Sequence, residues 1–416
     1  MKLNLTTESN RIVRFVKNMD TPIPKKRSNL IDLEELYNDI NAARTFVTHN
    51  NISVSKVVTN VNTTVDVDRS LAHAKMGGRG FVDKTIRDTI RSSMLFSVKY
   101  AFRMFDRTYT LVFNVCDITD IDKTDRMFER VVAWLCVADR YSSSTSTCAQ
   151  KLDIHIFLSG AQKRMPTETI ETIGKTHVNS AYTYCCRTDN QIVIYRKEEW
   201  FKVFIHETMH AFGLDFCGST NTSSVVDRHI RPTFDIDSDM NVYEAYCETW
   251  ATIVNSMFGI IAATHPPTSY SEFTKQLGAH MNTEVAFSTF QMNKVLLHMG
   301  LEYRDLYASS GSDGSTRRGL LYREDSEVFS YFVVKTILLY HYDLFIAWCG
   351  KHNTTLINFS ARKKNIESFC KFIISLHRKK GFVDHVDLTA THLDAQPSGR
   401  TFVMKSARMS AHSYVF

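Results

Sequence analysis

A short apolar segment that carries two histidines four residues apart is the feature that most constrains the fold. The run HETMH occupies positions 206–210 and follows the largely apolar run WFKVFI at 200–205. Acidic residues at Glu198 and Glu199 and a glycine at Gly213 are typical of the start and end of a helix. Residues four apart lie on one face of an α-helix. We therefore expect a short, largely buried helix that presents His206 and His210 side by side.

The periodicity of apolar residues changes at this helix. Helical and strand patterns alternate before it, and helical patterns dominate after it, which predicts an α+β fold with two lobes. The predicted parts are a polar arm or linker at 1–30, an N-terminal α/β lobe of mixed sheet and helices at 31–218, a mainly helical C-terminal lobe at 219–380, and an unassigned tail at 381–416. The predicted helices are 31–46, 84–105, 125–139, 168–173, 240–258, 269–299, 326–348 and 363–377, and the predicted strands are 109–116, 152–158, 180–185 and 191–195.

Charge and hydropathy argue against nucleic-acid and membrane partners. The formal net charge of +6 is small for 416 residues, and the basic clusters are separated in sequence, which is typical of a solvated surface. The start of the chain lacks the apolar core of a secretory signal. Lys335, His341 and Asp343 interrupt the most apolar later stretch, so a buried helix explains it better than a membrane span. We expect a soluble, cytoplasmic protein, and the sequence does not predict its oligomeric state.

The cysteine pattern favours a reducing compartment. The nine cysteines are odd in number and scattered, and no CxxC pair occurs. Adjacent cysteines rarely bridge, so Cys185 and Cys186 are expected to pack within a strand rather than to form disulfides. A cysteine zinc knuckle is not expected.

The two histidines and the glutamate between them fit zinc chemistry. Imidazole nitrogens four residues apart can bind one tetrahedral ion, and Glu207 can reach a water molecule held by that ion. The glutamate would remove a proton from this water, and the hydroxide would attack a polarised carbonyl. A half-buried pair of structural histidines is the alternative interpretation.

A third metal ligand is needed, and its position separates classes of zinc site. The metzincin pattern requires a ligand three residues after Gly213, but Phe216 stands there and Asp215 is out of register. The next predicted helix contains Glu244 and Glu248, four residues apart and beside an apolar stripe, and a partly buried acidic pair favours a nearby cation. An ordinary solvated acidic pair is the alternative.

This arrangement resembles the gluzincin metallopeptidases, over roughly residues 109 to 258. The resemblance implies a zincin-like fold, Glu244 as the third zinc ligand and Glu248 as the partner that orients His206. The reverse assignment, with Glu248 on zinc, stays open. The run Gln191–Trp200 also resembles uncharacterised metallopeptidase-like proteins of large DNA viruses.

Two further expectations follow from the same resemblance. Gluzincins carry an edge strand before the motif that pairs with the bound peptide, and Ala181 and Tyr182 lie at a suitable distance, although Ser180 interrupts the usual sequence. An ordinary edge strand is the alternative. A tyrosine or histidine of the later lobe would stabilise the oxyanion. The candidates are His265, Tyr270, His280, His298, Tyr322, Tyr331, Tyr340 and His341.

The sequence therefore predicts a zinc metallopeptidase that binds one zinc ion and acts on polypeptides, with Glu207 as the general base. The alternatives are a non-catalytic zincin-like structural or binding protein, for example a virion component, and a zinc hydrolase that acts on a non-peptide amide.

Overall fold

The chain consists of two compact units. The computed structural model describes residues 4–19, 21, 31–49, 52–61, 63–76, 82–168, 171–307, 312–396 and 401–415. One unit, here called the sheet unit, contains Leu33–Gln162, Asn179–Leu214 and Val415. The other, here called the helical unit, contains the residues up to Asp32, Lys163–Val178 and Asp215–Tyr414. Mixed sheet and helices in one unit and helices in the other confirm the α+β fold class.

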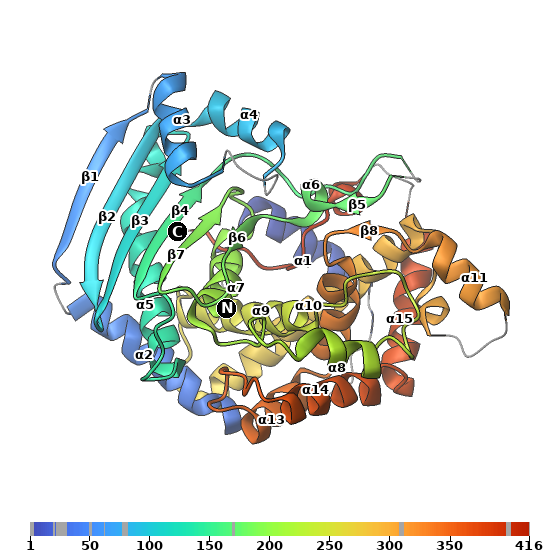
Figure 1. Cartoon of the computed structure of the whole chain (residues 1–416). Coiled ribbons are helices and arrows are strands. Elements are labelled where there is room, and N and C mark those ends of the chain that lie inside the picture. The colour runs from blue at the N-terminus through green and yellow to red at the C-terminus, as the bar shows by residue number, and fades with distance from the viewer. Residues whose placement is uncertain are drawn as a thin grey trace. The chain divides into compact units, whose positions relative to one another are not determined.

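A six-stranded mixed sheet forms the centre of the sheet unit (Figure 1). Its strand order is β1-β2-β3-β4-β7-β6, with β3, β4 and β7 parallel and the other neighbouring pairs antiparallel. Strand β6 is paired on one side only, by β7, within the part of the chain that the structure describes. The strands are β1 Val54–Asn60, β2 Phe96–Met104, β3 Arg107–Val115, β4 Lys151–Phe157, β6 Ala181–Thr183 and β7 Asp189–Ile194.

Helices cover both faces of this sheet. Apolar residues of α3 and α4 share a buried cluster with Val193 and Tyr182, which lie on β7 and β6. On the other face, aromatic residues of β2 and β3 pack against α5 and α7; Tyr100 stacks on Phe128 with ring centroids 4.6 Å apart. The helices of this unit are α2 Glu34–His49, α3 Thr64–His73, α4 Lys84–Ser93, α5 Lys123–Tyr141 and α7 Trp200–Phe212.

The helical unit is built around the long helix α10. Its neighbours include α1, α9, α12 and α15, and one buried cluster joins Ile12, Phe287, Leu393 and Val403. This unit also contains two very short strands that pair in parallel, β5 Ile173–Gly174 and β8 Glu324–Asp325. Its helices are α1 Thr7–Met19, α6 Lys175–Val178, α8 Thr222–His229, α9 Val242–Ile261, α10 Tyr270–His298, α11 Ser312–Leu321, α12 Lys335–Tyr340, α13 Tyr342–His352, α14 Lys363–Leu376, α15 Lys380–Asp394 and α16 Phe402–Lys405.

Two predicted helices are wrong in part. The predicted helix 84–105 ends at Ser93, and β2 follows, because every second residue from Val98 to Met104 is buried and this period of two suits a strand. The predicted helix 326–348 is a π-helix at Phe329–Val334 followed by α12 and α13, with a break at His341. Glu168–Ile173 is not helical in its described residues.

The two ends of the chain also differ from expectation. Much of the predicted polar arm is helix α1, whose buried face includes Ile12 and Val16; residues 1–3, 20 and 22–30 lie outside the described residues. The predicted tail contains α15 and α16, and every residue from 406 to 414 is buried. The boundary between the units after the histidine helix falls at Leu214, four residues before the predicted one.

No single helix among the described residues is long and apolar enough to cross a membrane. Helices at Phe329–Tyr340 and Tyr342–His352 together reach the required length and composition, but they are bent by 91° relative to each other.

Candidate metal centre

Helix α7 positions the two histidines of the HETMH run. All thirteen residues of the helix are buried, as the sequence predicts for a helix that is apolar on most sides. The helix ends at Gly213, whose φ of 66° lies in the left-handed region that glycine adopts without steric cost. The backbone N–H of Gly213 donates to the carbonyl of His210, and that of Leu214 donates to the carbonyl of Met209. This cap fixes the last turn, which carries His210.

The two imidazole rings converge on one point. The Nε2 atoms of His206 and His210 are 3.0 Å apart, and the side chains are 5% and 6% exposed. Two zinc–nitrogen bonds of about 2.0–2.1 Å at a tetrahedral angle would place the nitrogens about 3.3 Å apart. The pair therefore fits two ligands of one zinc ion.

Glu207 lies on the same buried helix and is 8% exposed. Its carboxylate acts electrostatically on Tyr195, which follows β7. Burial is the largest cause that raises the pKa of the Tyr195 hydroxyl; Arg196 opposes it, and the negative charge of Glu207 adds to it. The Glu207 carboxylate is therefore near enough to the end of β7 for its charge to act on Tyr195.

Strand β6 contains the predicted substrate-binding residues Ala181 and Tyr182. It is antiparallel to β7 and contacts α7. Anchors outside the strand fix its position: the N–H of Tyr195 donates to the carbonyl of Ser180, and Arg196 Nε donates to the carbonyl of Asn179. The Tyr182 hydroxyl donates to the carbonyl of Ala74, 2.6 Å away, so its ring lies in the core. Any recognition by Tyr182 would therefore use its backbone.

Glu244 lies in the first turn of α9, in the helical unit. Its Oε2 atom accepts a hydrogen bond of 3.1 Å from the hydroxyl of Tyr331, which projects from the π-helix. Nearby, Asn241 Nδ2 donates to Glu327 Oε1 at 2.6 Å. Burial, and next the negative charge of Glu244, raise the pKa of Glu327 to about 8. Single π-helical turns are frequent at functional sites, and this one presents Tyr331 to the predicted ligand.

Glu248 lies one turn further along α9. It is 2% exposed, and its Oε1 atom is 3.8 Å from Lys335 Nζ on α12. Lys335 also donates to the carbonyl of Met409. A buried ammonium ion compensates this carboxylate, so Glu248 is not a solvated acidic residue, whereas Glu244 is partly exposed.

Four of the remaining oxyanion candidates have contacts elsewhere in the helical unit. Tyr340 donates to the carbonyl of Gly381, Tyr322 donates to Glu324 Oε1, His298 contacts the carbonyl of Glu171, and His280 stacks on His412. Tyr331, another of the eight candidates, donates to Glu244.

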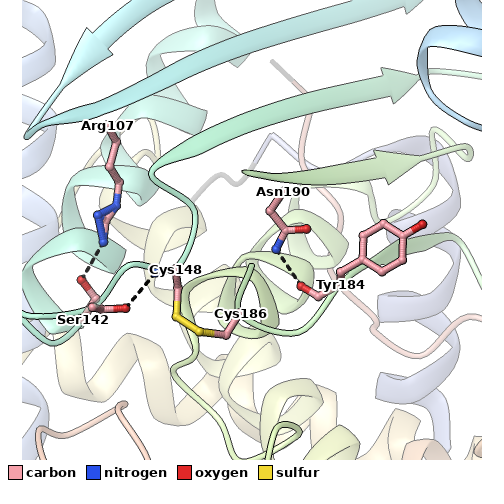
Figure 2. The surroundings of a disulfide bond; sticks show 7 residues. Arg107, Ser142, Cys148, Tyr184, Cys186 and Asn190 are labelled. Carbon is pink, nitrogen blue, oxygen red and sulfur yellow. Dashed lines mark hydrogen bonds between the residues drawn. A yellow bond between two sulfur atoms is a disulfide. The ribbon is translucent and has the colours of Figure 1, made fainter. Parts of the chain in front are cut away.

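The prediction that Cys185 and Cys186 only pack within a strand is wrong, because both are disulfide-bonded. Cys186 forms a disulfide with Cys148, with the two Cα atoms 4.6 Å apart (Figure 2). The turn between β6 and β7 places Cys186 beside the loop that leads into β4. A partner 38 positions away in the sequence is not visible from cysteine spacing. Among the described residues, five cysteines form no disulfide: Cys116, Cys136, Cys247, Cys349 and Cys370.

Among the described residues, three groups of His, Cys, Asp and Glu side chains could hold a metal ion, and His206, His210 and Glu244 form one of them. The other groups include Asp215, which the sequence analysis set aside as out of register, and Cys247, which it did not consider as a ligand. Both are buried in the helical unit, and Cys247 Sγ is 3.5 Å from Asp215 Oδ2. The burial of these two residues would have marked them as candidates. The sequence analysis tested only the ligand spacing of metzincins, which does not report burial.

Comparisons with known proteins found no relative of this chain. No family model matches the chain, and no curated protein or solved structure is significantly similar to it.

Proposed function

We propose that the protein is a zinc-dependent hydrolase of peptide bonds. His206 and His210 would bind the ion together with Glu244, and Glu207 would act as the general base. The observation that carries the proposal is the pair of buried imidazole Nε2 atoms 3.0 Å apart, with a buried carboxylate at the next position of the same helix. Bound zinc would supply Lewis acidity, which acidifies a water molecule and polarises a carbonyl.

The residues of the chain have separate tasks in this proposal. Glu207 accepts a proton from the attacking water and delivers it to the departing amine, as a general base that becomes a general acid. Strand β6, an edge strand in contact with α7, offers main-chain groups to an extended peptide. This strand favours a peptide over a small amide, which would not need it.

Zinc content of the purified protein tests the proposal directly. We expect close to one zinc ion per chain by elemental analysis, and none in His210→Ala, because a two-ligand site binds zinc weakly. His229→Ala, on α8, is the matched control and should keep its zinc. Absence of zinc from the wild-type protein after reconstitution would exclude a zinc hydrolase.

Tyr331→Phe tests whether Glu244 is a ligand. The change removes the hydroxyl that donates to Glu244 Oε2. Because partners of ligating carboxylates orient them, zinc affinity should fall roughly tenfold. Competition with a chromophoric chelator measures this affinity. The control Tyr340→Phe removes a hydroxyl bonded to the carbonyl of Gly381 and should leave zinc affinity unchanged. If Tyr331→Phe binds zinc as tightly as Tyr340→Phe does, the assignment of Glu244 is contradicted.

A further inference from the structure

The Cys148–Cys186 disulfide lies against the C-terminal end of α7. The backbone N–H of Cys186 donates to the carbonyl of His210 at 3.0 Å. A Cβ atom added to Gly213 would be 3.1 Å from Cys148 Sγ and 3.5 Å from Cys186 Sγ. The bridge therefore contacts the helix cap directly, and its loop supplies a partner for the carbonyl of a predicted metal ligand. Carbonyls of a last helical turn have no partner within the regular helix, and that of His210 accepts from both the Cys186 N–H and the capping Gly213 N–H.

The loop that carries Cys186 is held in an unfavourable backbone conformation. Cys186 has a φ of 39° and Ala149, beside Cys148, has a φ of 53°, both in the left-handed region that non-glycine residues rarely adopt. Two hydrogen bonds hold the same loop: the N–H of Ala149 donates to the carbonyl of Arg187, and Asn190 Nδ2 donates to the carbonyl of Tyr184 (Figure 2). Such conformations persist only where the surroundings enforce them. The covalent bridge is one of these constraints.

A reductant can reach the bridge. Cys186 and the three residues that follow it are exposed, whereas Cys148 is buried. Exposed disulfides are more often labile or regulatory than buried ones.

We propose that Cys148 and Cys186 are positioning residues whose disulfide makes zinc binding by α7 dependent on redox state. This inference rests on the proposed function. In the oxidised protein the bridge keeps the Cys186 N–H on the carbonyl of His210 and fixes the last turn. After reduction Cys186 relaxes from its left-handed conformation, that hydrogen bond is lost, and the His210 imidazole loses its fixed position. Zinc affinity then falls, by at least roughly tenfold, as is usual when a partner of a metal-ligating residue is removed.

A trialkylphosphine is the reductant for the test, because it is not itself a thiol and so adds no thiolate that would compete for the zinc ion. The phosphorus atom donates an electron pair that breaks the S–S bond, and water supplies the oxygen of the phosphine oxide. The two protons of the water molecule go to the two sulfurs, which become the thiols of Cys148 and Cys186.

The experiment measures zinc affinity and amide hydrogen exchange in the full-length protein, with and without phosphine. Competition with a chromophoric chelator, with Zn²⁺ as the probe, should show the roughly tenfold loss on reduction. In the zinc-free protein, reduction should accelerate exchange of the Cys186 and Gly213 amides, both of which donate to the His210 carbonyl. The amide of Phe113, in the middle of the sheet, should be unaffected.

The double variant Cys148→Ala/Cys186→Ala is the control. In the absence of phosphine it should match the reduced wild-type protein in zinc affinity, and phosphine should not change it further. Cys185 and Cys217 are also disulfide-bonded, so an equal effect of phosphine on the wild type and the double variant would assign the effect to them and overturn the proposal.

Hydrogen exchange separates this inference from the proposed function. Unchanged exchange of the Cys186 and Gly213 amides on reduction would overturn the positioning role, even if the protein binds zinc. Faster exchange with unchanged affinity would overturn the redox dependence of binding. The oxidised protein could also bind no zinc and still show faster exchange of these amides on reduction. That result would overturn the zinc hydrolase, and redox control of zinc binding with it, but not the positioning of α7.

Discussion

Glu207→Gln should bind zinc as the wild-type protein does and hydrolyse peptides roughly 10²–10⁴-fold more slowly. The amide has nearly the same shape as the carboxylate, so the buried helix and its two histidines should keep their geometry. It cannot accept a proton from the attacking water, and general-base catalysis contributes a factor of this order. The measurement is cleavage of a peptide library, together with zinc content.

A control variant shows whether a loss of cleavage is specific to Glu207. Glu129→Gln, at an exposed position of α5 in the same unit, should retain full activity. Undiminished cleavage by Glu207→Gln would rule out Glu207 as the general base. If the wild-type protein binds zinc but cleaves no peptide of the library, the alternative of a non-catalytic zincin-like protein gains support.

Glu284→Gln should destabilise the helical unit by about 3 kcal/mol at pH 7, a large fraction of typical protein stability. Glu284 lies on α10 and is fully buried. Its carboxylate accepts hydrogen bonds from the Ser410 hydroxyl, the N–H groups of Ala411 and His412, and His412 Nδ1. An amide nitrogen would face N–H donors and leave one of them unpaired. Urea unfolding at pH 7 measures the change in the free energy of unfolding.

The difference in the free energy of unfolding between wild type and Glu284→Gln should also depend on pH. Burial would raise the pKa of Glu284, but the hydrogen bond and charge of His412 and the N–H of Ala411 outweigh it and lower the pKa to about 2. A carboxyl group with a lowered pKa stabilises the folded state fully above its unfolded pKa of roughly 4.3, and this contribution declines as pH falls towards 2. The difference between wild type and Glu284→Gln should therefore be smaller at pH 3 than at pH 7.

Two comparisons check the origin of this effect. Burial chiefly lowers the pKa of neighbouring His280 to about 3, so both proteins should lose some stability between pH 6.5 and 3 for that separate reason. Glu367→Gln, at a partly exposed position of α14, should change stability by less than roughly 0.5 kcal/mol. A wild-type stability equal to that of Glu284→Gln at pH 7 would contradict the role of Glu284.

Local patterns were enough to predict much of the fold. The helix at 200–212, its glycine stop and the long helices α9 and α10 follow from periodicity and capping, which depend on residues a few positions apart. The convergence of His206 and His210 also follows from sequence, because both residues lie on one helix and helical geometry alone brings them together.

Only the tertiary structure decided the contacts between residues distant in the sequence. The disulfide joins positions 38 apart, Tyr331 meets Glu244 across 87 positions, and Glu284 holds a C-terminal segment more than 120 positions away. The buried polar segment after residue 405 resembled a tail because its sequence has no apolar period. Its backbone is instead paired by buried side chains of α9, α10 and α12. Periodicity reports the face that a segment buries, whereas such polar partners are fixed only when the chain has packed and each buried group must be hydrogen-bonded.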